Sequence, residues 1–412
     1  MVLIGTPAGK LQRIRKWGRD AFAALLRAIF TVIAFVGWLA GDRRRDLASL
    51  RIEKILLIRV DLLGDLVLTM PAVAAVRRRY PKAHITMLVL PYTAPALELF
   101  PYVDEVLSFD INKLRPSGDM LNPAHYQELW RLLRKLRQEK FDLCVSFHGL
   151  YAGLFSFLSG SLARAGYRGE GCPFLYNVPL PGKRYSIPQH EVHYDMALAR
   201  AAGAEDTQAA PDAAIPQYAS ENVATLLAKE GISPHDLLIA FHPGSANGSA
   251  KRWPAPGWAA LADRLFNDLG ARIVLTGVNS ELPLAKDIVG MTKNRPAVLT
   301  GKTSIVEAAA LLARCRVLVS GDSAPLHMAS AIGTPVVALH GPTDPDISGP
   351  FGGRSVVIWK KTECSPCYDL SDTAECRNKT LLCMRAITPE EVYTAVESLL
   401  QTPARMTPGA TA

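Results

Sequence analysis

The stretch SGDSAPLHMASAIGTPVVALHGPTDP (Ser320–Pro345) follows the apolar run Val317–Val319. An acid, a hydroxyl and an imidazole come soon after this strand-like run, and a helical run leads from them to a second apolar run, VVALH. Strand, turn, helix and strand is the order of a parallel α/β unit, whose ligands bind at the carboxyl ends of the strands. We therefore expect a ligand where Asp322, Ser323 and His327 gather.

This alternation of strand and helix fills two blocks of the chain. The strand-like runs of the first block are Lys54–Val60, His84–Leu90, Val103–Phe109 and Phe141–Phe147, and its helical runs include Asp65–Tyr80 and Tyr126–Gln138. The second block restarts at Leu237, with a helix at Trp258–Leu269 and strands at Ala271–Gly277, Arg316–Gly321 and Pro335–Gly341. The alternation predicts an α/β fold of two parallel-sheet domains, each doubly wound.

Domain boundaries follow from composition. The stretch 202–234 is rich in Ala, Pro and Asp, so we divide the chain there into 51–215 and 216–386, preceded by an N-terminal arm, 1–50. A last helix and tail occupy 387–412. Thr388 is the expected cap of that helix, with Pro389 at its first position and Glu391 as the partner of the cap.

The chain is basic only near its N-terminus. Of its 46 Lys and Arg and 38 Asp and Glu, 12 and 4 lie within residues 1–60, so the rest of the chain has 34 of each. A neutral body is not typical of a nucleic-acid-binding protein, so no nucleic acid is expected as a partner. Hydrophobic residues make up 49% and charged residues 20% of the chain, which is globular composition.

The N-terminal arm joins this charge to an apolar block, Ala21–Gly41, with Trp17 before it and Trp38 inside it. The block approaches the ~20 residues that span a bilayer, but Arg27 interrupts it. The sequence DRRRD at Asp42–Asp46 is a poor cleavage site for a signal peptide. We interpret the arm as a membrane-surface helix, since basic flanks suit anionic headgroups and Trp suits the interface. A helix packed on the protein itself and a short span are the alternatives.

The seven Cys residues do not indicate a disulfide scaffold. Cys144, Cys172 and Cys315 are scattered and are expected to be buried packing residues. The others form a late cluster: Cys364, Cys367, Cys376 and Cys383. Its C-x-x-C start suits a structural metal or a disulfide, but six residues separate its last two thiols, where zinc ribbons usually have two. We therefore assign no metal site.

Two familiar phosphate-binding motifs are missing. No GxGxxG follows the first strand-like run. The GKT at Gly301–Thr303 imitates the end of a Walker A loop, but Pro296 stands where its first glycine belongs. Ser304 and Glu307 instead have the spacing of a helix capping box. ATP hydrolysis is therefore not expected.

Asp65 follows a glycine at the junction of the first strand-like run and its helix. An acid at this place is often only a partner of the helix dipole, worth at most ~1 kcal/mol. Asp61, four residues earlier, is its rival for any chemical role. Both are candidates on position alone.

The loop HPGSANGSAKRWP (His242–Pro254) also follows a strand-like run. Its small residues, Gly244 and Ser245 among them, let backbone N–H groups approach an anion that Lys251 would neutralise. The helix near Ser323 aims N–H groups at the same kind of ligand. Asp322 would repel phosphate, so it is better suited to accept hydrogen bonds from sugar hydroxyls.

Together these motifs resemble glycosyltransferase family 9, the ADP-heptose:lipopolysaccharide heptosyltransferases, over about Lys54–Leu400. The matching stretches are LGDLVLTMPA at Leu63–Ala72, HGL at His148–Leu150, HPGS with AKRWP in the loop above, GDSAPLH at Gly321–His327 and GPTDP at Gly341–Pro345. The arm lies outside the usual pattern of the family, and a cysteine-rich tail occurs in some members only.

The resemblance implies a GT-B architecture, in which two Rossmann-like domains face a cleft, with the acceptor on 51–215 and the nucleotide-sugar on 216–386. It implies metal-independent inverting transfer without a cofactor. Asp65 matches the general base for the acceptor hydroxyl, and Lys251 matches the lysine that holds the donor phosphate. The further substrate-binding candidates are Asp322, Ser323, His327, Gly244, Ser245, His148 and Thr343.

We therefore expect an enzyme at the cytoplasmic face of the inner membrane. It would move a heptose from ADP-heptose, or a related nucleotide-sugar, to the lipid A-linked core of lipopolysaccharide. The alternatives are another donor or glycolipid acceptor within the family, and a non-catalytic nucleotide-binding membrane scaffold. The scaffold has no need of Asp65, Lys251 and Asp322 together, so we favour the enzyme.

Overall fold

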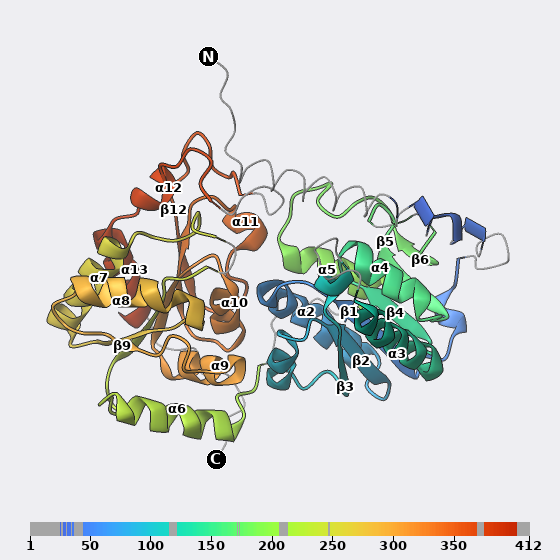
Figure 1. Cartoon of the computed structure of the whole chain (residues 1–412), viewed down its shortest axis with the longest axis horizontal. Coiled ribbons are helices and arrows are strands. Elements are labelled where there is room, and N and C mark those ends of the chain that lie inside the picture. The colour runs from blue at the N-terminus through green and yellow to red at the C-terminus, as the bar shows by residue number, and fades with distance from the viewer. Residues whose placement is uncertain are drawn as a thin grey trace. The chain divides into compact units, whose positions relative to one another are not determined.

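The computed structural model describes residues 44–114, 122–170, 172, 174–205, 213–245, 248–368 and 375–401, with residues 25, 28, 29, 31–33, 35 and 36 of the arm. The chain forms two compact units, Met1–Pro211 and Asp212–Ala412, which we name the first and the second unit. The division lies inside the predicted stretch 202–234, four residues before the predicted start of the second domain. Figure 1 shows a sheet covered by helices in each unit.

In the described part of the first unit, parallel strands form one sheet in the order β3-β2-β1-β4-β5-β6. The strands are β1 (Lys54–Arg59), β2 (His84–Val89), β3 (Glu105–Ser108), β4 (Leu143–Ser146), β5 (Ala163–Tyr167) and β6 (Val178–Leu180). The helices are α2 (Leu63–Arg79), α3 (Pro123–Glu139), α4 (Gly149–Leu158) and α5 (Glu191–Ala201), with short 3₁₀ helices at Leu47–Ser49, Ala94–Leu99 and Ile111–Leu114.

The central strand β1, KILLIR, is apolar on both faces, and such a strand needs helices on both sides of its sheet. Leu56 and Ile58 of β1 pack with Leu136 of α3 and Phe155 of α4 on one face. The connection from β1 through α2 to β2 crosses the sheet in the direction opposite to the connection from β4 through α4 to β5. The right-handed crossover rule therefore places α2 on the opposite face from α4. There α2 packs against α5.

The described part of the second unit repeats this plan, with parallel strands in the order β12-β11-β10-β7-β8-β9. The strands are β7 (Leu238–His242), β8 (Arg272–Leu275), β9 (Ala297–Val298), β10 (Val317–Gly321), β11 (Val336–His340) and β12 (Ser355–Trp359). The helices are α6 (Gln217–Lys229), α7 (Ala255–Leu269), α8 (Leu282–Met291), α9 (Ile305–Arg314), α10 (Ala324–Ala331), α11 (Pro345–Ser348), α12 (Leu382–Arg385) and α13 (Pro389–Gln401), with a 3₁₀ helix at Asn279–Glu281.

Aromatic packing closes the core of the second unit. The Trp258 ring of α7 lies 5.1 Å from Phe241 of β7 and 5.2 Å from Trp253, measured between ring centroids. The Trp253 indole N–H donates to the Ile387 carbonyl oxygen at 3.0 Å, so this side chain is a packing residue below the loop. Helix α13 packs on α7 and β12, so it belongs to the core of the second unit rather than forming a separate part.

Two predicted helix starts are confirmed. The Thr388 hydroxyl accepts from the backbone N–H of Glu391 at 3.3 Å at the start of α13. The Ser304 hydroxyl accepts from the backbone N–H of Glu307 at 3.2 Å at the start of α9. The Glu307 carboxylate in turn accepts from the Ser304 backbone N–H. The GKT sequence thus precedes a capped helix, as expected from its spacing.

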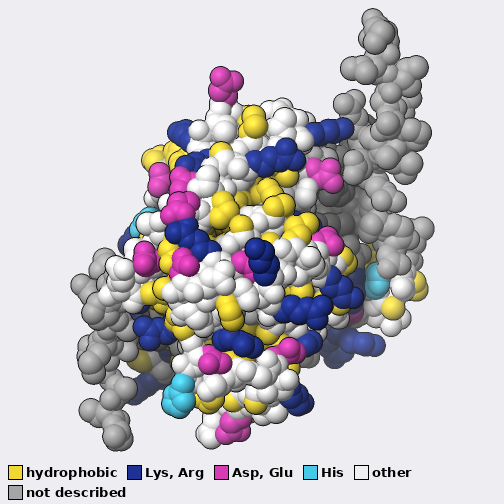
Figure 2. Space-filling model, turned by 90° about the vertical axis from the view of Figure 1, so that its left-hand side faces the viewer, with side chains coloured by type: hydrophobic (Ala, Val, Ile, Leu, Met, Phe, Trp, Pro, Cys, Tyr) yellow, Lys and Arg dark blue, Asp and Glu magenta, His cyan; other side chains and the backbone are white. Residues whose placement is uncertain are grey.

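Little of the arm is described. The ring of Phe35, a described residue of the arm, lies 5.4 Å from the ring of Phe174 outside the arm, measured between centroids. Among the described residues, no helix has the length and apolar character needed to cross a bilayer. The face in Figure 2 carries basic and acidic side chains side by side, unlike the single-sign surface that binds nucleic acid. The remainder of the predicted membrane helix lies outside the described residues.

A candidate active site in two parts

Each sheet reverses the direction of its strand order once, and ligands of α/β sheets bind at such points. In the first unit the reversal lies between β1 and β4, and in the second unit between β7 and β10. The predicted site residues follow these strands. Asp65 comes after β1, His148 after β4, Gly244 after β7 and Asp322 after β10.

In the first unit, Asp65 lies in the first turn of α2 beside Arg59, the last residue of β1. The Arg59 guanidinium is 2% exposed and lies 3.2 Å from the Asp61 carboxylate, 3.3 Å from Asp195 and 3.7 Å from Asp65. Burial raises the pKa of Asp65 against the opposing pull of Arg59, and the charge of Asp61 raises it further. A carboxylate with a raised pKa takes up a proton more readily, which suits a general base.

A buried charge network holds Arg59 in place. The Asp195 carboxylate accepts from the Thr69 hydroxyl at 2.7 Å and from Arg184 at 2.7 Å, as well as from Arg59. Arg184 also pairs with Glu191 at 2.6 Å. Despite burial, the charges of Asp195 and Glu191 raise the pKa of Arg184 above its ordinary value. Sequence reasoning missed this network, whose only signal was an arginine ending an otherwise apolar strand.

His148 stands at the start of α4, after β4. Its Nδ1 lies 3.2 Å from the Glu170 carboxylate, which also accepts from the Gly149 backbone N–H at 3.2 Å. Burial lowers the pKa of His148, but the bond to Glu170 and the charge of Asp61 outweigh it, so the pKa is raised. The protonated, donating form of this ring is thereby favoured. Sequence reasoning found His148 but not its partner Glu170.

In the second unit, Lys251 and Asp322 form an ion pair, with 2.9 Å between the ammonium nitrogen and a carboxylate oxygen. The Lys251 ammonium also lies 4.1 Å from the centre of the Tyr368 ring. A side chain at Gly321 would lie 2.8 Å from the Lys251 carbonyl oxygen, so this glycine lets the loop rest against the end of β10. Two residues with separate predicted roles are thus direct partners.

The Asp322 side chain is 6% exposed and is held ionised by its surroundings. Burial by itself would raise its pKa, but the charge of Lys251 and the nearby His327 imidazole hold the pKa of Asp322 well below its usual range. The His327 Nε2 lies 3.7 Å from Asp322, and the Ser348 hydroxyl donates to the same carboxylate at 3.2 Å. His327 therefore faces Asp322.

Ser323 directly precedes α10, but its side chain makes no capping bond to the helix. Its hydroxyl lies 3.0 Å from that of Ser320 instead. The first-turn N–H groups of α10 therefore have no side-chain cap from Ser323, and a bound anion could accept from them. After the next strand, β11, the Thr343 hydroxyl lies 3.2 Å from Nδ1 of His340, the last residue of that strand, whose pKa is lowered by burial.

The loop after β7 packs against a carboxylate that sequence reasoning missed, Glu281 of the 3₁₀ helix Asn279–Glu281. A side chain at Gly244 would collide with the carboxylate of Glu281, and one at Gly277 would come within 2.7 Å of it. Glu281 is 7% exposed and accepts from the Val278 backbone N–H at 2.9 Å. Gly244 therefore makes room for this acid in the described structure. Nothing in the spacing of the loop indicated a carboxylate 37 residues away as its neighbour.

Ser245 lies in the same loop and is held through its backbone. Its carbonyl oxygen accepts from the Arg252 guanidinium at 2.9 Å, across the turn that leads to Lys251. The side chain of Arg252 thus braces the loop rather than extending freely into solvent. This leaves Lys251 as the cation of the loop that stands at the end of β10.

Two Rossmann-like units, each with a polar site where its strand order reverses, form the architecture called GT-B. Residues 129–378 match the profile described as glycosyltransferase family 9 (heptosyltransferase). The chain belongs to this family. It is 28% identical to the lipopolysaccharide heptosyltransferase 2 of Salmonella typhimurium over 370 residues, which cover 84% of this chain and 98% of that protein.

Solved structures show the same fold. The glycosyltransferase family 9 protein of Veillonella parvula is 24% identical, with a TM-score of 0.70 and coverage of 84% of this chain and 97% of that one. The ADP-heptose LPS heptosyltransferase II of Escherichia coli is also 24% identical, with a TM-score of 0.67 and coverage of 84% and 98%. The predicted fold class and family are confirmed.

Proposed function

We propose that this glycosyltransferase moves a heptose from ADP-heptose to the inner core of lipopolysaccharide. The observation that carries the proposal is the buried pair of Lys251 and Asp322 beside the start of α10, where the strand order of the second unit reverses. It supplies a cation, uncapped N–H groups and a carboxylate, which are the groups that a nucleotide diphosphate joined to a sugar requires. The names of the relatives support heptose and lipopolysaccharide as its substrates.

The donor would bind in the second unit. The Lys251 ammonium and the N–H groups that follow Ser323 would hold the diphosphate, and Asp322 would accept hydrogen bonds from hydroxyls of the sugar. Glu281, a buried carboxylate against Gly244, is suited to accept from the ribose hydroxyls. His327 and Ser348 would keep Asp322 oriented when Lys251 turns toward phosphate.

The acceptor would bind in the first unit. Asp65, with its raised pKa, would remove the proton from the acceptor hydroxyl as that oxygen attacks the anomeric carbon of the sugar. The bond from that carbon to the diphosphate oxygen breaks, its electron pair leaves with ADP, and the anomeric configuration inverts. His148, held by Glu170, is placed to donate a hydrogen bond to the acceptor.

Charge stabilisation of the departing ADP would come from Lys251 and α10, so we propose that the transfer needs no divalent metal. The proposed acceptor is a membrane-anchored anionic lipid, so we propose that the enzyme acts at the cytoplasmic face of the inner membrane. The basic, Trp-bearing arm would hold it there through anionic headgroups.

A donor screen tests this function. The purified full chain is incubated with a panel of nucleotide-sugars and a core-oligosaccharide acceptor, with and without EDTA, and free nucleotide is measured. We expect ADP release only with ADP-heptose and acceptor together, at a rate that brief exposure to EDTA leaves unchanged. Release from another nucleotide-sugar would replace the donor in the proposal, and release from none would make the chain a non-catalytic binding protein.

A further inference from the structure

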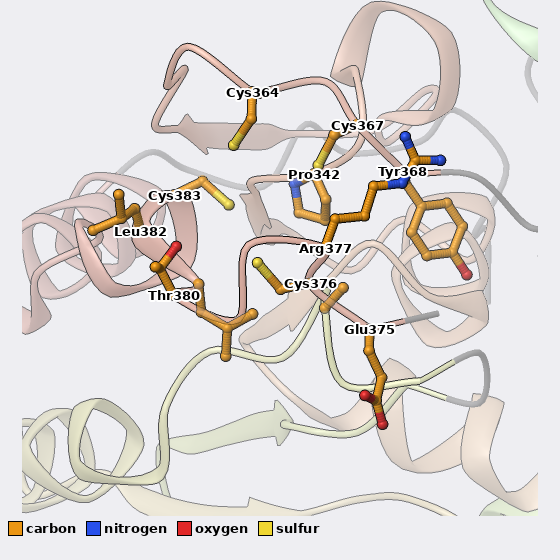
Figure 3. A pocket seen from close by; sticks show the side chains of 12 residues that line it. Pro342, Cys364, Cys367, Tyr368, Glu375, Cys376, Arg377, Thr380, Leu382 and Cys383 are labelled. Carbon is orange, nitrogen blue, oxygen red and sulfur yellow. The ribbon is translucent and has the colours of Figure 1, made fainter. Parts of the chain in front are cut away.

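Four thiols that are scattered over 20 residues of sequence meet in one place. The side chains of Cys364, Cys367, Cys376 and Cys383 line a single cavity behind the end of β11, and Figure 3 shows them pointing into it. The cavity volume of about 20 Å³ leaves room for one water-sized sphere. All four thiols are free of disulfides. The sequence spacing, with six residues between the last two, did not predict this convergence.

Backbone hydrogen bonds tie part of the cluster to the segment that follows β11. The N–H groups of Cys367 and Tyr368 both donate to the Pro342 carbonyl oxygen, at 2.8 and 2.9 Å. A side chain at Gly341 would lie 2.9 Å from the Cys383 sulfur, so glycine is required for α12 to approach the strand end. Cys367 and Cys383 are therefore held against the segment that follows β11.

We propose that these four cysteines bind one thiophilic metal ion, Zn²⁺ or iron, through four thiolates. Four sulfur ligands are characteristic of zinc or iron rather than of Mg²⁺ or Ca²⁺, which prefer oxygen. In the described residues, no three His, Cys, Asp or Glu side chains stand close enough together to hold an ion as they are. Metal–sulfur bonds of ~2.3 Å would draw the sulfurs to roughly 3.8 Å from one another.

The metal would also support the donor site, a consequence that rests on the proposed function. Tyr368 directly follows Cys367, and its ring lies against the Lys251 ammonium at 4.1 Å. A metal that fixes Cys367 therefore fixes Tyr368, which in turn limits where Lys251 can point. The ion would act as a structural support at a distance from the reacting atoms.

Metal analysis of the full chain tests the site. The protein is purified under reducing conditions from cells supplied with zinc and iron, and its metal content is measured by plasma mass spectrometry. We expect close to one ion per chain, and an iron form would add thiolate-to-iron absorption in the visible range. In the wild-type protein, an organomercurial that modifies the four thiols should release the ion in step with their modification.

Matched variants separate this site from the other thiols. Cys367→Ser and Cys376→Ser should lose most of the bound metal, while Cys315→Ser, a buried thiol on another element, should keep it. Less than about a tenth of an ion per wild-type chain, both as purified and after reconstitution with Zn²⁺ or Fe²⁺, would overturn the proposal. Disulfides within the cluster, detected by mass spectrometry after purification under reducing conditions, would overturn it as well.

The coupling to the donor site has its own readout. Removing the metal from the wild-type chain should weaken ADP binding several-fold in calorimetry and leave the fold intact by circular dichroism. A chain that binds metal and binds ADP equally well with and without it would overturn the coupling, whereas the metal site would stand. A chain that binds metal but never binds ADP would overturn the proposed function instead.

Discussion

Removal of the Lys251 ammonium should lower the free energy of unfolding and, independently, weaken ADP binding. Its partner Asp322 is 6% exposed, and the two atoms of the pair are 2.9 Å apart. In Lys251→Ala the carboxylate keeps the His327 ring at 3.7 Å and the Ser348 hydroxyl at 3.2 Å as partners. Breaking a buried pair from one side costs roughly 3–5 kcal/mol of folding free energy. Because Lys251 retains 14% of its side-chain surface, we expect the low end, about 3 kcal/mol.

ADP binding should weaken in the same variant. A charge-assisted bond to the diphosphate is worth ~1.5–3 kcal/mol, which corresponds to roughly a 10- to 150-fold increase in the dissociation constant. Urea unfolding measures the first effect and isothermal titration calorimetry the second. The double variant Lys251→Ala with Asp322→Asn removes the unpaired charge, so it should regain most of the stability but none of the ADP affinity.

A surface lysine serves as the matched control. Lys302 pairs with Glu230 at 2.7 Å, and its side chain is 46% exposed. Lys302→Ala should therefore change stability by less than about 1 kcal/mol and leave ADP affinity unchanged. ADP affinity equal to that of the parent chain in Lys251→Ala would remove Lys251 from the donor site. Failure of the double variant to regain stability would refute the reasoning about the buried charge.

The other predictions concern the base and the arm. Asp65→Asn should reduce turnover by roughly 10²–10⁴-fold with little change in ADP affinity, whereas Asp61→Asn should be much milder, and equal losses would contradict the assignment. Because the pKa of Asp65 is raised, turnover should fall as pH drops through a value above the ordinary 3.8, where the base becomes protonated and inactive. An acid limb at or below 3.8 in the pH–rate profile would argue for a different base. Deleting residues 1–46 should leave a folded enzyme with normal turnover on a delipidated acceptor but weak binding to anionic vesicles, since each basic residue near the surface contributes ~1 kcal/mol. A truncated chain that fails to fold, or that binds the vesicles as tightly as before, would make the arm a structural element.

Periodicity in the sequence was sufficient for the fold class, because apolar strands and amphipathic helices each have their own repeat. The central strands, β1, β7, β10 and β11, lay within predicted runs, since their residues are apolar on both faces. Strands β5, β6, β9 and β12 were not predicted. Strand β9 has two residues, and β5 contains an arginine and a glycine that break the apolar pattern. Such strands form because a neighbouring strand offers hydrogen bonds, which no local pattern records.

The sequence by itself also determined which polar residues follow the central strands, and therefore where a ligand would bind, because parallel strands align their carboxyl ends. The tertiary structure alone decided which of these residues are partners. Lys251 meets Asp322 across 71 residues, Arg59 meets Asp195 across 136, and the last two thiols of the Cys cluster reach the first two. Each pairing depends on the order in which strands join the sheet and on which loops then lie side by side. Burial decides the strength and titration of these charges, and burial is a property of the packed chain rather than of spacing along it.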